Sequence, residues 1–312
     1  MCCLFGLIDY HRSLSAKQKN HILSILAAAC EVRGTDATGI AYNSQGKLQI
    51  YKRPVPGHQL RFCVPDDAWT VMGHTRMATQ GSAVKNRNNH PFPGHIRDGA
   101  FALAHNGVIS NDRKLRRSLS LPRTKIKTDS YIAVQLLEEE NALNFNSLKA
   151  MAEQVEGSFT FTVLSQHNRL FIVKGDNPLC LYRFSSLGLY VYASTKDILM
   201  RALAQLHLSI KQAEPITISC GEILCIDPSG KIARDHFDDS KLPWGLYGPL
   251  QACCTWEPNS PPPPRLCIPG SYLEEIKSVA SSFGYAPEDI DRLAAMGFSP
   301  EELEEFLYCG EL

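Results

Sequence analysis

The residue with the clearest chemical potential is Cys2, at the second position of the chain. If Met1 is removed, which the small side chain of Cys2 favours, one residue carries both a thiol and a free α-amine. The reference pKa values are about 8.5 for a cysteine thiol and about 7.7–8.0 for an α-amine. The neutral amine can therefore take the thiol proton near neutral pH and later return it to a leaving amine. Cys2 is thus a candidate nucleophile that brings its own base.

Four other segments place polar residues near predicted strand ends or helix starts. They are Arg33-Gly34-Thr35-Asp36-Ala37-Thr38-Gly39; Gly73-His74-Thr75-Arg76-Met77-Ala78-Thr79-Gln80-Gly81 with Asn89-His90-Pro91-Phe92 shortly after; His105-Asn106-Gly107; and Lys127-Thr128-Asp129-Ser130. Together with Cys2, these segments resemble the class II glutamine amidotransferases, the family that contains the glutaminase domains of glucosamine-6-phosphate synthase and of the amidotransferase of purine synthesis. The resemblance covers about residues 2 to 230.

The resemblance implies a fold and a reaction. The fold is α+β: a four-layer αββα N-terminal nucleophile hydrolase sandwich, here followed by a small C-terminal helical module. The reaction is hydrolysis of the glutamine side-chain amide to glutamate and ammonia, through a γ-glutamyl thioester on Cys2. Amide hydrolysis passes through a tetrahedral oxyanion, and each donor aimed at that oxygen lowers the barrier by about 3–4 kcal/mol. By resemblance, the donors are the side-chain amide of Asn106 and the backbone N–H of Gly107. The alternative for Asn-Gly is a hairpin turn.

The ends of free glutamine are a carboxylate and an ammonium, and the resemblance assigns a partner to each. Arg76 is the expected carboxylate clamp, because a guanidinium grips a carboxylate in bidentate fashion, and Asp129 is the expected partner of the ammonium. A surface arginine and a helix-capping aspartate are the alternatives. Thr79 is expected in the pocket wall, and Arg33 and His90 are expected to support the site from behind.

No metal or cofactor is expected. His74, His90 and His105 stand at strand ends or in a loop without a carboxylate at ligand spacing, so we interpret them as core or loop histidines. The eleven cysteines are scattered and form no Cys-x-x-Cys pair. Because no secretory signal precedes them, reduced thiols and a cytoplasmic location are expected.

Local patterns predict the elements that must position these residues. Ser15 and Gln18 form a capping-box pattern at a helix start, and Gln45-Gly46 indicates a hairpin. Predicted helices lie at about 15–29, 128–137, 148–155 and 198–206, and predicted strands at about 38–43, 48–52, 69–75, 101–105, 158–165, 170–174, 179–184, 189–193 and 223–226. The apolar run after Cys2 is a further strand, and a long polar loop is expected from Thr79 to Asp98. Clustered rather than alternating helices and strands favour an α+β layered architecture.

The composition divides the chain into three parts. We expect the amidotransferase domain at 2–240, a proline-rich linker at 241–270 and an acidic three-helix mini-domain at 271–312. The mini-domain holds ten acidic and two basic residues, while the whole chain has 32 of each sign. Its predicted helices begin near Ser271, Pro287 and Ser299. Zero net charge argues against general nucleic-acid binding, and no apolar run is long enough to span a membrane.

The acceptor of the ammonia is expected on another polypeptide. The residues after about 230 contain no sugar-isomerase-like domain, phosphoribosyl-transfer motif or nucleotide-binding glycine loop. The expected partners are therefore glutamine and a separate synthase subunit. Two alternatives stay open: a freestanding amidase acting on glutamine or another γ-glutamyl compound, and a catalytically silent glutamine-sensing module. The basic stretch from Arg113 to Lys127 is either a solvated surface or a site for the acidic tail or an acidic partner.

Overall fold

The computed structural model describes residues 2–242, 277, 286–295 and 303. The chain divides into two compact units, Met1–Thr255 and Trp256–Leu312. The larger unit is built on two β-sheets in which every strand pairing is antiparallel.

The first sheet has seven strands in the order β11-β9-β10-β1-β4-β2-β3. Its members are β1 (Cys3–Asp9), β2 (Ala37–Ser44), β3 (Lys47–Arg53), β4 (Thr70–Arg76), β9 (Cys180–Phe184), β10 (Leu189–Ala193) and β11 (Glu214–Ile216). The second sheet has six strands in the order β13-β12-β8-β7-β6-β5. Its members are β5 (Phe92–Ile96), β6 (Gly99–Ile109), β7 (Gly157–Ser165), β8 (Leu170–Lys174), β12 (Glu222–Ile226) and β13 (Ile232–His236).

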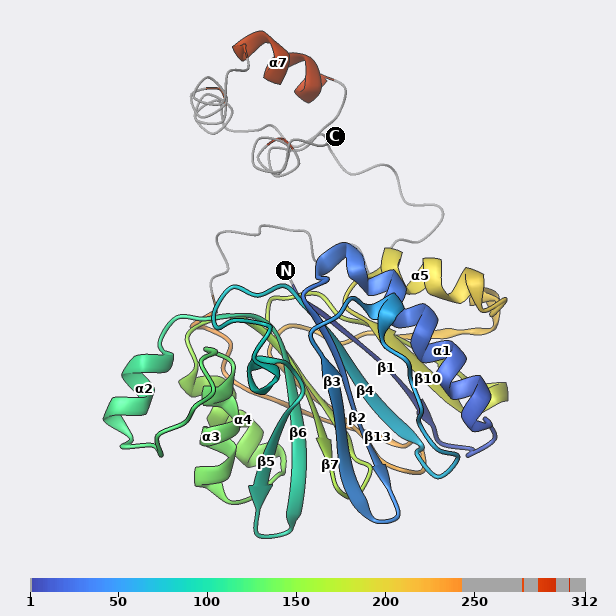
Figure 1. Ribbon diagram of the computed structural model, residues 1–312, viewed down its shortest axis with the longest axis horizontal. Helices are drawn as coiled ribbons and strands as arrows, with labels where there is room; N and C mark the ends of the chain where they lie inside the picture. The colour runs from blue at the N-terminus through green and yellow to red at the C-terminus, as the bar shows by residue number, and fades with distance from the viewer. Residues whose placement is uncertain (1, 243–276, 278–285, 296–302, 304–312) are drawn as a thin grey trace. The chain divides into compact units, whose positions relative to one another are not determined.

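Helices cover the outer face of each sheet (Figure 1). The first sheet is covered by α1 (Ala16–Ala29) and α5 (Lys196–Gln205), and the second by α3 (Tyr131–Glu140) and α4 (Phe145–Gln154). A short helix, α2 (Asp112–Ser118), follows β6, and single turns form η1 (Cys30–Arg33), η2 (Gly57–Gln59), η3 (Asn86–Asn88), η4 (Ser185–Leu187) and η5 (Ile210–Gln212). Apolar side chains from both sheets meet in a central layer. The expected four-layer αββα sandwich is confirmed.

The strand after Cys2 is buried on both faces, which explains its unbroken apolar sequence. Cys3, Phe5 and Leu7 belong to the cluster beneath α1 and α5, whereas Leu4 and Ile8 belong to the layer between the sheets. Successive side chains of a strand point to opposite faces. By the same alternation, the residue before Cys3 lies on the side that faces the second sheet.

Two local predictions are confirmed in detail. Ser15 caps α1: its Oγ accepts from the backbone N–H of Gln18, and the Gln18 side chain accepts from the N–H of Ser15 at 2.9 Å. The turn between β2 and β3 has Gln45 and Gly46 at φ 50° and 71°, the left-handed pair that closes a two-residue hairpin.

Other predictions are corrected by the structure. The stretch from Thr79 to Asp98 is not wholly loop, because it contains η3 and β5, and β13 follows the strand expected to be the last. β11 was not predicted either, and all three missed strands are edge strands. An edge strand tolerates Pro93 in β5 and the polar sequence of β13, since one side of its backbone needs no partner strand. Helix α2 lies within the basic stretch, where no helix was predicted.

The strand expected to end at His105 continues through Asn106 and Gly107 to Ile109, so the hairpin alternative for Asn-Gly is wrong. This extension is possible because β6 pairs with β7 from Phe101 through Ile109. The helix expected from Thr128 begins instead at Tyr131. The Asp129 side chain does not cap it, since its Oδ2 accepts from the backbone N–H of Ile109 at 2.7 Å.

In the smaller unit, the structure describes one helix, α7 (Pro287–Ala295), which begins with the proline that predicted its start. Ile290 and Leu303 are buried. Apart from Lys241, Leu242, Lys277 and Leu303, the proline-rich linker and the helices predicted near Ser271 and Ser299 lie outside the described residues. Within the described residues, no helix has the length and apolar character needed to cross a membrane.

Candidate active site

A pocket forms where the start of β1, the end of β4 and the last part of β6 come together. Six of its lining residues were predicted from the sequence: Cys2, Arg76, Thr79, His90, Gly107 and Asp129. The others are Met77, Gln80, His105, Thr128 and Ser130. Its free volume is about 10 Å³, which is room for about one water molecule. Residues far apart in the sequence thus share one small polar pocket.

Cys2 is half-buried, and its thiol donates a hydrogen bond to the carbonyl oxygen of Met77 at 3.5 Å. Burial raises the pKa of the Cys2 thiol, the nearby Arg76 guanidinium lowers it and the Asp129 carboxylate raises it; the net shift is upward. The thiol is therefore protonated at neutral pH. A reaction that uses it as a nucleophile needs a base.

The start of β1 is held by three neighbours. Arg33, in η1, donates from Nε to the carbonyl oxygen of Cys2 at 3.0 Å. The backbone N–H of Leu4 donates to Oγ of Ser194 at 2.8 Å. The Sγ atoms of Cys3 and Cys30 lie 3.0 Å apart in the core beneath α1. Arg33 does not line the pocket among the described residues, but it contacts the backbone of the candidate nucleophile, as expected of a supporting residue.

The backbone conformation at position 107 requires glycine. Its φ is +141°, and a Cβ atom there would lie 1.9 Å from the carbonyl oxygen of Ser158. Asn106 is completely buried and is absent from the lining of the pocket as described. Its Nδ2 lies 3.5 Å from Oγ of Ser194, and its Oδ1 finds no hydrogen-bond partner among the described residues. The role of Asn106 as an oxyanion donor stays a prediction.

Arg76, at the end of β4, is buried and held by oxygen atoms of the loop that follows it. Its Nη1 donates to Oδ1 of Asn89 at 2.7 Å, and its Nη2 donates to the carbonyl oxygens of Gly81, at 2.8 Å, and of Gln80. A surface arginine is therefore excluded. The guanidinium is fixed at the pocket wall with its positive charge close to Cys2.

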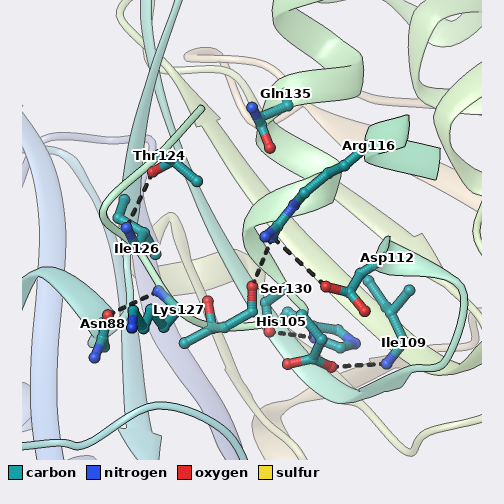
Figure 2. A network of polar contacts seen from close by, with 12 residues as sticks. Asn88, His105, Ile109, Asp112, Arg116, Thr124, Ile126, Lys127, Ser130 and Gln135 are labelled. Atoms are coloured by element: carbon teal, nitrogen blue, oxygen red, sulfur yellow. Dashed lines mark hydrogen bonds and ion pairs between the residues drawn. The ribbon is translucent and has the colours of Figure 1, made fainter. Parts of the chain in front are cut away.

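Asp129 lies between β6 and α3, on the other side of the pocket from Arg76. The Asp129 carboxylate accepts from the N–H of Ile109 (Figure 2). The residues directly before and after Asp129 are also held by hydrogen bonds. Arg116 donates from Nη2 to the carbonyl oxygen of Thr128 at 3.0 Å. Ser130 Oγ lies 2.8 Å from Nδ1 of His105. Asp129 therefore has a well-defined position among buried polar groups.

The three histidines form one buried cluster. The rings of His74 and His90 stack with 4.2 Å between their centroids. His74 Nε2 lies 3.0 Å from the carbonyl oxygen of His105, and His90 Nδ1 accepts from the N–H of His105 at 3.2 Å. Burial lowers the pKa of all three, that of His74 to about 3. They are neutral structural groups, and no cluster of metal-ligating side chains occurs within the part of the chain that the structure describes.

Several polar residues that hold the site were given no role by the sequence analysis, although Asn89 stands in one of the segments that it identified. Ser194 follows an apolar strand, Asn88 and Asn89 sit in a polar loop, and Arg116 belongs to the basic stretch. All make hydrogen bonds to site residues or their neighbours. The available signal was weak: Asn89 directly precedes His90, which was predicted, but nothing in the local pattern of Ser194 distinguishes it from an ordinary surface serine.

Comparisons with known proteins show which proteins this chain is similar to. The family described as a glutamine amidotransferase domain matches residues 74–201. The glutamine--fructose-6-phosphate aminotransferase of Sulfurisphaera tokodaii is 31% identical over 190 residues, which are 58% of this chain and 31% of that protein. The 7-cyano-7-deazaguanine synthase of Saccharolobus solfataricus is 28% identical over 226 residues, 70% of this chain and 46% of that protein. The chain thus spans about a third to a half of the length of these relatives.

Two solved structures share the fold. An allosteric regulatory enzyme of purine biosynthesis superposes with a TM-score of 0.61, and the glutamine phosphoribosylpyrophosphate amidotransferase of B. subtilis with 0.59. Each is 20% identical and the match covers 76% of this chain and 49% of the other. The sandwich and the cysteine before β1 define an N-terminal nucleophile hydrolase fold. More narrowly, residues 74–201 match the glutamine amidotransferase domain family.

Proposed function

We propose that the larger unit hydrolyses the side-chain amide of L-glutamine and passes the ammonia to an acceptor carried by a separate polypeptide. The observation that carries the proposal is the pocket itself. It brings a cysteine thiol, a buried guanidinium and a buried carboxylate together in a domain of the glutamine amidotransferase family.

In the first half of the reaction, the α-amine exposed by removal of Met1 takes the proton of the Cys2 thiol. The raised pKa of this thiol makes such a base necessary. The sulfur attacks the side-chain carbonyl carbon of glutamine, and the carbonyl π electrons move to oxygen. The N–H of Gly107 and the side-chain amide of Asn106 stabilise this oxyanion.

In the second half, the tetrahedral intermediate collapses. The C–N bond breaks, the leaving nitrogen takes the proton held by the α-amine, and ammonia departs from a γ-glutamyl thioester. The same amine then removes a proton from a water molecule that attacks the thioester carbon. The C–S bond breaks, the thiol is regenerated and glutamate is released.

Arg76 and Asp129 bind the charged ends of the substrate, the α-carboxylate and the α-ammonium. Both hydrogens of Arg76 Nη2 are engaged by the carbonyls of Gln80 and Gly81. A bidentate carboxylate must displace at least one of them. Since the free volume of about 10 Å³ is also too small for glutamine, the segment from Met77 to Gly81 has to move when the substrate enters.

The names of the relatives, an aminotransferase and a synthase, are consistent with transfer of ammonia to a second substrate. A cytoplasmic location, in keeping with the free thiols of the described cysteines, belongs to the same proposal.

The test is ammonia release from L-glutamine by the wild type and by Cys2→Ala and Cys2→Ser. Cys63→Ala is the matched control, because Cys63 is exposed and does not line the pocket in the described structure. Intact mass establishes whether Met1 is removed and detects a thioester adduct. We expect release by the wild type and the control and none by Cys2→Ala.

Each outcome discriminates among the candidate functions. Slow release that rises when a synthase subunit is added supports the proposal, whereas fast release without a partner favours a freestanding amidase. Glutamine binding without turnover favours a sensor. Full activity of Cys2→Ala would refute the mechanism.

A further inference from the structure

Two adjacent asparagines lie behind the pocket, where the segment that carries Arg76 meets the segment that carries Asp129. We call the first segment the guanidinium arm and the second the carboxylate arm. Asn88 ends η3 and Asn89 follows it, and their relative exposures are 1% and 0%. Neither lines the pocket among the described residues. A buried amide is stable only when its donors and acceptors are paired, so the partners of these two side chains define what they hold.

Asn89 holds the guanidinium arm. Its Oδ1 accepts from Nη1 of Arg76 at 2.7 Å, and its Nδ2 donates to the carbonyl oxygen of Ala83 at 2.7 Å. The first bond orients the guanidinium, and the second fixes the asparagine to the loop that follows β4. Lys52 holds the backbone of the same residue, since its Nζ donates to the Asn89 carbonyl oxygen.

Asn88 holds the carboxylate arm. Its Oδ1 accepts from the backbone N–H of Lys127 at 3.0 Å, a contact drawn in Figure 2, and its Nδ2 donates to the carbonyl oxygen of Ser82 at 3.0 Å. Lys127 stands two residues before Asp129. The two arms also touch directly, because a Cβ atom on Gly81 would lie 2.3 Å from the Lys127 carbonyl oxygen.

We propose that Asn88 and Asn89 are positioning residues that set the separation between the Arg76 guanidinium and the Asp129 carboxylate, so that the pocket selects ligands carrying an α-ammonium and an α-carboxylate on one carbon. This inference rests on the roles of Arg76 and Asp129 in the proposed function. An α-amino acid offers its two charges at one fixed spacing. A binding site that misplaces either partner loses charge interactions that are strong in a partly buried pocket.

The experiment measures binding by calorimetry in the full chain with Cys2→Ala, so that no ligand is consumed. The probes are L-glutamine, glutaramate, which lacks the α-ammonium, and 4-aminobutyramide, which lacks the α-carboxylate. Asn88→Ala should weaken L-glutamine binding about tenfold and leave glutaramate within about twofold. Asn89→Ala should weaken L-glutamine to a similar extent and leave 4-aminobutyramide within about twofold.

A double variant separates positioning from general damage. In an Asp129→Asn background, Asn88→Ala should cause no further loss of L-glutamine affinity, because the group it positions has already lost its charge. Asn43→Ala is the matched control. Asn43 is buried, and its Nδ2 donates to the Ser165 carbonyl oxygen at 2.9 Å. Both residues belong to strands, and neither lines the pocket in the described structure. It should leave all three affinities unchanged.

Arg116→Ala tests the same arm if Asn88→Ala does not fold. The Arg116 side chain is 26% exposed and holds the Thr128 carbonyl from outside. Its loss should likewise weaken L-glutamine and spare glutaramate. An equal loss of affinity for all three ligands in the asparagine variants, or no loss in either variant, would overturn the inference. Ammonia release by the wild type would still support the proposed function. Selective loss in a protein that binds glutamine without releasing ammonia would support the inference and refute the proposed function.

Discussion

The backbone N–H of Leu4 donates to Oγ of Ser194, 190 residues further along the chain, at 2.8 Å. Ser194 follows β10, and its hydroxyl also lies 3.5 Å from Nδ2 of Asn106 in the other sheet. One completely buried hydroxyl therefore connects the strand that carries the candidate nucleophile with the predicted oxyanion donor. Neither contact involves Arg76 or Asp129, the groups that we propose bind the charged ends of glutamine.

Ser194→Ala should therefore affect the chemical step more than substrate binding. We expect kcat for glutamine hydrolysis to fall about tenfold while KM changes less than about twofold. The unpaired Leu4 N–H should lower the free energy of unfolding by about 1–3 kcal/mol. Steady-state kinetics and urea unfolding measure both. Ser165→Ala is the control, since the Ser165 hydroxyl is also buried and accepts a backbone N–H, from Arg169 at 3.1 Å. Equal changes in kcat for the two variants would contradict the role of Ser194.

Gly107→Ala should be far more destabilising than alanine at another left-handed glycine. The φ of +141° and the Ser158 carbonyl at 1.9 Å leave no room for a methyl group. We expect a loss of about 3–5 kcal/mol in the free energy of unfolding, or failure to fold. Gly46→Ala is the control, because Gly46 has φ +71° and nothing within 4 Å of its Cβ position. It should cost about 1 kcal/mol. Similar losses at both sites, measured by urea unfolding, would refute the steric argument.

Sequence patterns predicted the parts of the fold whose signals are local. The capping box of Ser15, the Gln45-Gly46 turn and the apolar strands follow from residues next to one another, and the structure has them within a few positions. The edge strands β5, β11 and β13 were missed because they are short and contain proline or charged residues, which an edge strand tolerates. The start of α3 was misplaced because Asp129 makes a tertiary hydrogen bond instead of a cap.

The candidate site likewise contains some residues that the sequence could identify and others that it could not. Cys2, Arg76 and Asp129 have side chains whose chemistry identifies them once a family resemblance orders them. The chemistry of Ser194, Asn88 and Asn89 is ordinary, and their importance comes from the partners that the fold brings to them. A hydrogen bond between residues 4 and 194 has no sequence signal, so only the structure could assign these positions.

The buried histidines predict acid lability. Folding favours their neutral form, so below the reference pKa of about 6.5 the unfolded chain binds more protons than the folded one. Their contribution to stability is complete above that pH and is lost as the pH falls toward the value of about 3 for His74. Each group contributes at most about 1.4 kcal/mol per pH unit. We expect the free energy of unfolding to decline between pH 6.5 and 5.5, before most carboxylates titrate.

His74→Phe tests this assignment. Phenylalanine preserves a ring against His90 but cannot take up a proton, so the decline between pH 6.5 and 5.5 should be shallower by about 1 kcal/mol than in the wild type. The variant should also be less stable at pH 7.5, because the contact of His74 Nε2 with the His105 carbonyl is lost. His21→Gln is the control, since His21 is exposed. Parallel slopes for His74→Phe and the wild type would show that His74 does not cause the acid lability.

The protonation state of Cys2 can be measured by its alkylation. Burial raises the pKa of this thiol above that of an ordinary cysteine, although Arg76 opposes the shift. Only the thiolate reacts with iodoacetamide, so the rate at Cys2 should be low at pH 7 and rise about tenfold per pH unit up to pH 9. Mass spectrometry of tryptic peptides separates Cys2 from the exposed Cys63, which serves as an internal control for general reactivity. A Cys2 rate that is already maximal at pH 7 would mean a preformed thiolate, and the α-amine would then not be needed to remove the thiol proton.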